Sequence, residues 1–131
     1  MNEIKHTPGP WILETVPTSV GSCHKIGRFP GAGHRPHTYA CVYADGIRPG
    51  IDDALPAAIE LAANARLMAA APDMADVLEM IAADDDAARK LGMQPLLTSA
   101  VRTALDAALI KAGRKAAPEP VRHVTIAGGA L

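Results

Sequence analysis

The hydrophobic pattern of this chain changes once, near Asp52, and this change constrains the fold more than any other feature. Before that point, glycine and proline interrupt short runs rich in β-branched and aromatic residues, which is typical of strands and loops. After it, apolar residues recur every three or four positions in alanine-rich segments, which is typical of amphipathic helices. We therefore predict an α+β fold, in which a small N-terminal antiparallel sheet packs against two or three C-terminal helices.

Three strands are expected in the N-terminal part. They are predicted at Trp11–Val16, Cys23–Phe29 and Thr38–Ala44, because β-favouring residues gather there between glycines and prolines. The pair Asp45 and Gly46 follows the last of these runs and predicts a turn. The sheet is therefore expected to be complete before the helical part begins.

The helical part begins where an acidic residue can cap the first helix. Asp52 or Asp53 is suited to this role, and Pro72 is expected to end the first helix and to start a second. A third helix is predicted from about Pro95 to Lys115. The expected apolar stripes are Leu55, Ile59, Ala63, Leu67 and Ala70, then Met74, Val77, Leu78 and Ile81, then Leu97, Val101, Leu105 and Leu109.

Length and composition indicate one domain with a thin core. The 131 residues are 49% hydrophobic but only 3% aromatic, so most of the buried side chains are small and bury little area each. We therefore expect a homo-oligomer, in which the helices complete their core against another subunit. The single α+β domain is assigned to residues 1–115, and the proline- and glycine-containing residues 116–131 to a flexible or loosely attached tail.

The distribution of charge excludes some partners and favours others. A formal net charge of -1 argues against binding long nucleic acid through bulk charge. No apolar run approaches the ~20 residues of a membrane span, and no signal-peptide core follows Met1, so we expect a protein of the host cell cytoplasm without a membrane partner. Residues 15–44 contain no acid, however, and predict a locally positive surface.

The acid-free stretch supplies the first candidate ligand-binding residues. Lys25, Arg28 and Arg35 lie among glycines, whose backbone N–H groups can approach an anion while the cations neutralise it. Phe29 and Tyr43 are placed to stack on a base. These residues favour a small anionic nucleotide as the ligand, and a solvated surface loop is the alternative interpretation.

Asn64 and Arg66 add an amide and a planar guanidinium to an otherwise apolar helix. Residues two apart on a helix point about 200° from each other, so both cannot face one ligand squarely. One is expected to brace the neighbouring elements and the other to reach a ligand or a second subunit. A purely structural network that fixes the helix end near Pro72 is the alternative.

The cysteines and histidines do not match a metal-site template. Cys23, His24, His34, His37 and Cys41 are permissible zinc ligands, but their spacing contains neither a CxxC nor an HxxxH pattern. We expect reduced thiols, no metal and no cofactor.

Catalysis is not indicated either. No serine or cysteine is placed beside a base in a recognisable pattern, so an enzyme is not expected. The triplet Asp84–Asp86 is interpreted as a hydrated helix end, because three consecutive carboxylates diverge around a helix.

Four segments of the chain resemble those of a family of short phage and prophage proteins. They are Thr7–Trp11, Gly21–Gly27, Ala40–Asp45 and Ala63–Pro72, and the resemblance covers roughly residues 6–80. It implies a phage origin but no particular reaction.

The expected layout, an N-terminal sheet followed by helices, is also similar to phage anti-Thoeris and anti-CBASS sponge proteins. Those proteins bind cyclic ADP-ribose-type signals, and some bind cyclic oligonucleotides, without cleaving them. The similarity implies a phage-encoded anti-defence protein that sequesters a cyclic nucleotide immune signal. The alternatives are an anti-CRISPR-like inhibitor that binds a host defence protein and a structural phage accessory protein. A concave pocket with a cationic side chain favours the sponge, and a flat charged patch favours the inhibitor.

Overall fold

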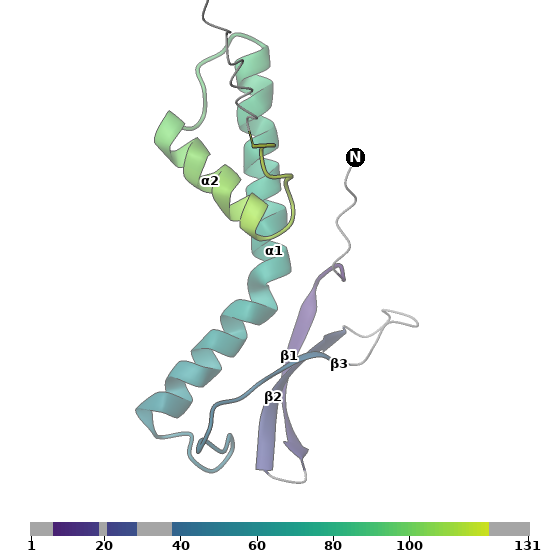
Figure 1. The fold of residues 1–131 in the computed structure, drawn as a ribbon, viewed down its shortest axis with the longest axis vertical. Helices are drawn as coiled ribbons and strands as arrows, with labels where there is room; N and C mark the ends of the chain where they lie inside the picture. Colours follow the sequence, from purple (N-terminus) through teal and green to yellow (C-terminus); the bar gives the residue numbers. More distant parts are fainter. Residues whose placement is uncertain (1–6, 19–20, 29–37, 121–131) are drawn as a thin grey trace, which may run out of the picture.

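A computed structural model describes residues 7–18, 21–28 and 38–120 of the chain. It contains three strands followed by two helices: β1 (Trp11–Thr18), β2 (Gly21–Arg28), β3 (Thr38–Val42), α1 (Pro56–Lys90) and α2 (Ser99–Lys111). Figure 1 shows the sheet beside the N-terminal half of α1 and α2 beside its C-terminal half. The predicted α+β arrangement is confirmed.

The sheet is antiparallel, with the strands in the order β1-β2-β3. Trp11 lies opposite Arg28 at one end of the first pair, and Thr18 lies opposite Gly21 at the other. The pairing of β2 with β3 contains an irregularity at Ile26 and Gly27. All three strands were predicted from the sequence, and their observed bounds differ by at most two residues at either end.

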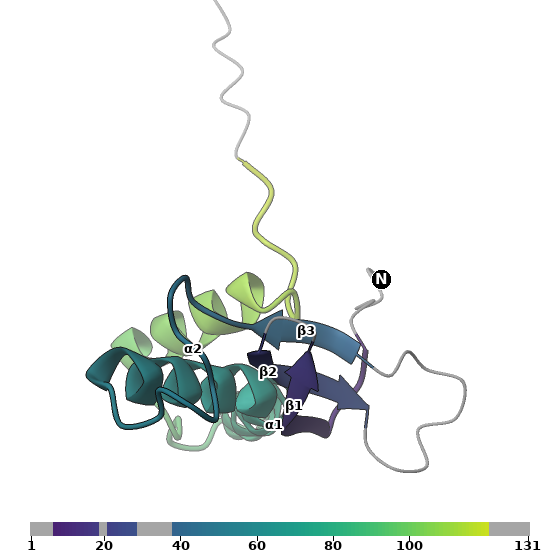
Figure 2. The ribbon, with the colours of Figure 1, turned by 90° about the horizontal axis from the view of Figure 1, so that it is seen from below.

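One face of the sheet forms the main core against α1. Side chains alternate along a strand, so His24, Ile26 and their partners Thr15 and Leu13 share the face that α1 covers. The buried side chains of this core come from two strands and one helix: Ile26, Val42, Leu61, Ala65 and Ala69. Figure 2 shows α1 lying along this side of the sheet.

The long helix α1 is continuous through Pro72, so the prediction of two helices separated at this residue was wrong. Proline lacks a backbone N–H and crowds the preceding turn, which bends a helix without necessarily ending it. α1 changes direction near its middle (Figure 1). Pro72 is also buried, so tertiary packing holds the helix together across the bend.

The predicted apolar stripe of α1 is not the face that the sheet covers. The face against the sheet is built from Ala58, Leu61, Ala65 and Ala69. The large side chains of the stripe remain accessible instead, with exposed fractions of 58% for Ile59, 60% for Leu67, 50% for Met74 and 53% for Val77. Small residues on the sheet side allow the helix to approach closely, and the larger apolar residues face outward.

The second helix packs on the C-terminal half of α1 through a smaller core. Leu105 and Leu109 are buried against Ala82. The Thr98 hydroxyl accepts a hydrogen bond of 3.3 Å from the Val101 N–H and caps the first turn. α2 is therefore shorter than the helix predicted between residues 95 and 115, because a side-chain cap defines its start. Within the described ranges, no helix is long and apolar enough to cross a membrane.

Candidate functional site

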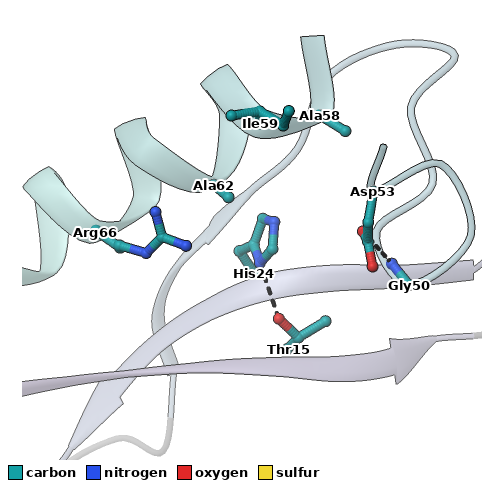
Figure 3. Close-up of a pocket in the computed structure, with 8 residues that line it drawn as sticks. All are labelled: Thr15, His24, Gly50, Asp53, Ala58, Ile59, Ala62 and Arg66. Atoms are coloured by element: carbon teal, nitrogen blue, oxygen red, sulfur yellow. Dashed lines mark hydrogen bonds between the residues drawn. The ribbon is translucent and has the colours of Figure 1, made fainter. Parts of the chain in front are cut away.

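A pocket of about 380 Å³ lies between the N-terminal half of α1, the β1–β2 pair and the loop that precedes α1 (Figure 3). Its volume lies within the range of small-molecule sites, ~300–1,000 Å³. The helix contributes mainly small and apolar side chains, and the sheet and the loop contribute polar groups. The lining residues are Thr15, His24, Gly50, Asp53, Ala58, Ile59, Ala62 and Arg66.

The sheet supplies a hydroxyl and an imidazole to this pocket. Thr15 and His24 are direct cross-strand partners, and 3.0 Å separates Thr15 Oγ1 from His24 Nδ1 in a hydrogen bond. His24 lies two residues from Ile26 on the same face of β2, at the point where the apolar core gives way to the pocket. The hydrogen bond fixes the orientation of the imidazole relative to the opening (Figure 3).

The loop before α1 is held in place by two of its carboxylates, those of Asp52 and Asp53. Asp52 accepts hydrogen bonds from the Arg48 backbone N–H at 2.8 Å and from Arg48 Nε at 3.2 Å. Asp53 Oδ1 accepts a bond of 2.7 Å from the N–H of Gly50, whose positive φ of 86° suits a glycine. The hydrogen bonds from Arg48 lower the pKa of Asp52. This local network places Asp53 on the pocket wall.

The expected role of Asp52 or Asp53 as a helix cap was wrong. The residue at the N-cap of α1 is Leu55, and its side chain makes no capping hydrogen bond. Pro56, at the first helical position, has no N–H that needs a partner. The two aspartates are therefore free to shape the loop instead.

Arg66 reaches the pocket from α1, two helical turns beyond Ala58. Its side chain makes no ion pair and no hydrogen bond to another residue within the described ranges. An exposed guanidinium at the edge of an apolar-lined pocket retains all its donors for a ligand. Among the pocket residues, it is the group best suited to an anion.

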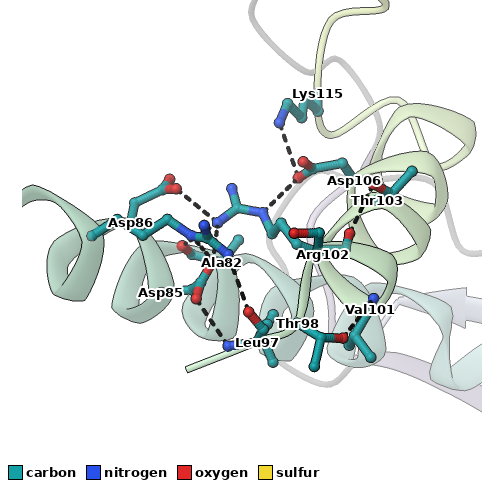
Figure 4. Close-up of polar contacts among 12 residues, drawn as sticks. Ala82, Asp85, Asp86, Leu97, Thr98, Val101, Arg102, Thr103, Asp106 and Lys115 are labelled. Atoms are coloured by element: carbon teal, nitrogen blue, oxygen red, sulfur yellow. Dashed lines mark hydrogen bonds and ion pairs between the residues drawn. The ribbon is translucent and has the colours of Figure 1, made fainter. Parts of the chain in front are cut away.

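A second group of polar side chains joins the C-terminal half of α1 to α2 (Figure 4). Asp85 is completely buried and accepts hydrogen bonds from Arg89 Nε at 2.8 Å, Arg102 Nη1 at 2.9 Å and the Leu97 N–H at 3.0 Å. The prediction of a hydrated acidic helix end was therefore wrong for Asp85. The carboxylate is buried because it faces α2 and because three donors satisfy it.

The Asp85 network is internally saturated. Arg102 Nη1 also lies 2.7 Å from Asp86 Oδ1, and Arg102 Nε lies 3.1 Å from Asp106 Oδ1. The hydrogen bond from Arg89 holds the pKa of Asp85 well below its usual range. The hydrogen bonds that Arg102 donates to Asp86 and Asp85 raise the pKa of Arg102. Because every charged group here has a partner within the protein, this network stabilises the packing of α2 and leaves no group for a ligand.

The family model described as Salmonella phage P22 protein Y8K6 matches residues 1–118. The chain belongs to this phage protein family. No curated protein and no solved structure matches the chain. The P22 Y8K6 family confirms the resemblance to phage proteins and extends it beyond residues 6–80, but it does not address the similarity to sponge proteins.

Two of the segments that resemble phage proteins meet in this member of the P22 Y8K6 family. A Cβ atom placed on Gly9 would lie 2.9 Å from Cβ of Pro72, so only glycine allows the N-terminal segment to lie this close to α1. Trp11 Nε1 donates a hydrogen bond of 3.0 Å to the Thr7 carbonyl. The centroids of the Trp11 and Tyr39 rings are 5.6 Å apart. These segments therefore contribute to the packing of the sheet on the helix.

Five of the seven predicted ligand-binding residues lie within the described ranges, and among these five only Arg66 lines the pocket. Lys25 lies 3.5 Å from Glu14 in an ion pair on the face of the sheet opposite to His24. Arg28 ends β2 opposite Trp11. The others are Tyr43, which follows β3 and is 71% exposed, Asn64, which is exposed on α1, and Phe29 and Arg35, which lie outside the described residues.

Three polar residues of the pocket were not predicted as ligand-binding residues. Thr15 and His24 are brought together by the strand register, which the sequence alone does not define. Asp53 reaches the pocket wall because of the loop hydrogen bonds. The alternation of His24 with the buried Ile26 is the signal that could have placed His24 on the helix side of the sheet.

The two cysteines lie close together on the open face of the sheet. Cys23 Sγ and Cys41 Sγ are 3.6 Å apart, which is the contact of two thiols and far longer than the ~2.05 Å of a disulfide. In the part of the chain that the structure describes, no group of three or more His, Cys, Asp or Glu side chains is arranged to hold a metal ion. His34 and His37 lie outside that part.

Proposed function

We propose that this phage protein binds a small anionic nucleotide in the pocket beside Arg66 and sequesters it without cleaving it. The observation that carries the proposal is the Arg66 side chain, which lines the pocket and makes no ion pair within the described ranges. A guanidinium presents a planar fork of donors that matches phosphate oxygens. An anionic group on the ligand would supply the partner that this arginine otherwise lacks.

The other lining residues support a nucleotide rather than a bare anion. His24 lies between Arg66 and Asp53 in the pocket (Figure 3). A phosphate bound by Arg66 would place the rest of the ligand near Asp53, whose carboxylate can accept hydrogen bonds from ribose hydroxyls or a base amino group. Ile59 and Ala62 offer an apolar surface to a base. The pocket therefore offers a cation for a phosphate, a carboxylate for hydroxyl or amino groups, and an apolar surface for a base. A nucleotide carries all three of these groups.

Binding without cleavage is proposed because the pocket offers an incomplete set of catalytic groups. Thr15 Oγ1 does lie 3.0 Å from His24 Nδ1, which places a hydroxyl beside a possible base. Within the described ranges, however, no carboxylate hydrogen-bonds to His24 to orient it as a base. The ligand is therefore expected to leave the protein chemically intact.

The proposed role of such binding is to counter host defence, and membership of a phage protein family supports this part of the proposal. Bacterial immune systems that signal through cyclic nucleotides depend on the free concentration of the signal. A phage protein that holds the signal in its pocket would lower that concentration and prevent activation of the host effector. This role requires affinity and abundance but no turnover.

Calorimetry against a panel of cyclic dinucleotides, cyclic trinucleotides and cyclic ADP-ribose isomers tests the proposal. At least one of these ligands is expected to bind, and Arg66→Ala should weaken its binding by about ten- to a hundredfold, because a charge-assisted hydrogen bond contributes ~1.5–3 kcal/mol. Lys111→Ala is the matched control, since it removes an exposed cation from α2, away from the pocket. Lys25→Ala tests the opposite face of the sheet and should also leave binding unchanged.

Two results would overturn the proposal. The first is binding that depends on Lys25 and not on Arg66, because the ligand would then lie outside the pocket. The second is the absence of binding to every member of the panel while the protein co-purifies with a host defence protein, which would support the inhibitor alternative. Chromatography of ligand released by heat should return unmodified ligand, and a hydrolysed product would exclude simple sequestration.

A further inference from the structure

An apolar stripe runs along α1 on the side that neither the sheet nor α2 covers. The four large side chains of its central part are exposed to 60% for Leu67, 50% for Met74, 53% for Val77 and 37% for Ile81. No charged residue interrupts the stripe over this length, because Arg66 and Asp73 lie to one side of it on the helix. A contiguous row of exposed large apolar residues on a folded helix usually marks an interface.

The spacing of the stripe is that of a helix–helix seam. Apolar residues alternate at intervals of four, three, four, three and four positions, which is the 3.5-residue repeat of two helices packed side by side. The seam spans 19 residues and is therefore roughly 28 Å long. Its members are Ala63, Leu67, Ala70, Met74, Val77 and Ile81.

The sizes of these side chains are complementary about the centre of the seam. In an antiparallel pair with its twofold axis at Pro72, residues equidistant from the axis face each other. Ala70 then faces the partner's Met74, Ala63 faces the partner's Ile81, and Leu67 faces the partner's Val77. Each alanine faces a large side chain of the partner, so each facing pair fills a similar volume between the two helices. A parallel pair would instead stack alanine on alanine and leave gaps in two layers.

We infer that α1 forms an antiparallel homodimer seam along these six residues, with the twofold axis near Pro72. The partner is a second copy of this chain, because the complementary face is the same stripe turned end to end. In each copy α1 changes direction near its middle, and Pro72 also lies near the middle of the helix, so the bend falls close to the crossing point. The helix is already ordered by the sheet and α2 in each subunit, so association does not have to order it. This inference stands independently of ligand binding.

Light scattering of the full-length protein with single substitutions provides the first test. The wild-type protein should have twice the chain mass of 13.6 kDa at micromolar concentration, and Leu67→Glu should reduce it to a single chain mass. Met68→Glu is the matched control, since Met68 is 48% exposed on the same helix but points about 100° away from the seam. Circular dichroism should show equal helix content in all three proteins, because neither position is buried.

A charge swap tests the antiparallel arrangement specifically. Val77→Lys alone should also weaken the dimer, whereas Leu67→Glu combined with Val77→Lys should restore it. In an antiparallel seam the new acid of each copy faces the new base of the other, but in a parallel seam like charges would face each other. The two positions are ten residues apart on one helix, so they cannot compensate within a chain.

Three outcomes would overturn the inference. A wild-type protein of 13.6 kDa would show that another part of the chain or a different protein covers the stripe. A dimer that withstands Leu67→Glu would place the interface elsewhere. A double variant that remains monomeric, with the helix content of the wild type, would exclude the antiparallel register. Because the seam does not contain Arg66, failure of the dimer and failure of nucleotide binding are separable.

Discussion

The two halves of α1 place arginine in opposite situations. In the N-terminal half, Arg66 lines a pocket and makes no ion pair within the described ranges. Near the C-terminal half, Arg102 lies between Asp85, Asp86 and Asp106 at distances of 2.7 to 3.1 Å. An arginine on an apolar, alanine-rich surface therefore does not by itself indicate a ligand-binding site. What matters is whether carboxylates of the same chain already satisfy its donors.

The same two halves also differ in how they are held together. The N-terminal half packs against a sheet through a core that includes Ile26, Val42 and Leu61. The C-terminal half has a smaller core of Ala82, Leu105 and Leu109, and ion pairs surround it. Small apolar contacts bury little area, so the polar network fixes the orientation of α2 where hydrophobic packing alone is limited. The pocket half instead has room for a ligand between the sheet and the helix.

The largest effect is expected from cavities in the two cores. Ile26→Ala and Leu109→Ala should each reduce the free energy of unfolding by ~2–5 kcal/mol, because these side chains are 1% and 3% exposed. If the continuous helix couples the two halves, both variants should show one transition at a lower temperature in calorimetry. Leu91→Ala is the control, since Leu91 is 74% exposed. Two separate transitions, each sensitive to only one substitution, would show that the halves are independent units.

A pH titration separates the saturated network from the pocket half. Because the folded pKa of Asp85 lies below its unfolded value, its contribution to stability is complete well above ~3.9 and is lost as the pH falls from ~5. Asp85→Asn should therefore lower the melting temperature at pH 7, and its difference from the wild type should shrink with acidification. The effect at pH 7 should be smaller than that of the cavities, because asparagine can still accept a hydrogen bond from Leu97.

The control for this titration is Asp53→Asn in the pocket half. Its carboxylate is exposed and, among the described residues, accepts a backbone hydrogen bond from Gly50, so the substitution should change the melting temperature much less. A difference between wild type and Asp85→Asn that persists unchanged at low pH would show that the Asp85 charge does not stabilise the fold.

A moderate effect is expected where the N-terminal segment meets the bend of α1. Gly9→Ala should destabilise the protein by ~1–3 kcal/mol, because the added methyl group would lie 2.9 Å from Cβ of the rigid Pro72 ring. Gly92→Ala provides a contrast, since Gly92 has a positive φ of 70° but open space around it. Chemical denaturation measures both. An unchanged midpoint for Gly9→Ala would show that the segment can move away from α1 without cost.

The sequence was sufficient for the fold class and the strands, but it was insufficient for the bounds of the first helix and for the faces that pack. The change of period near Asp52 predicted the α+β class, and β-favouring runs predicted all three strands. The predicted break at Pro72 was wrong because its ring is buried against the N-terminal segment. This contact joins Gly9 and Pro72, which are 63 positions apart in the sequence. The stripe of large apolar residues was also wrongly predicted to face the core, because the sheet packs mainly on small alanine side chains of α1.

The pocket shows the same limit. Arg66 was selected for its chemistry, and the structure places it on the pocket wall. Lys25 was selected for the same reason, but Glu14 lies opposite it on β1 and forms an ion pair with it. Glu14 lies just before the acid-free stretch of residues 15–44, so the composition of that stretch did not reveal this partner. Strand register and loop hydrogen bonds decide which charges meet, and neither follows from composition or spacing.

The smallest effect on stability, and the sharpest contrast with the buried Asp85 network, is expected at the cysteine pair on the open face of the sheet. Burial raises the pKa of Cys23, and so does its contact with Cys41, so Cys23 should be alkylated more slowly at pH 8 than a free cysteine. Cys41→Ala should speed its alkylation while changing the free energy of unfolding by less than ~0.5 kcal/mol, because Cys41 is exposed. Mass spectrometry of unreduced, denatured protein should find two alkylated thiols and no stoichiometric zinc. A mass two hydrogens lower without alkylation would show that the 3.6 Å contact closes into a disulfide, which would make this face a covalent constraint on the sheet.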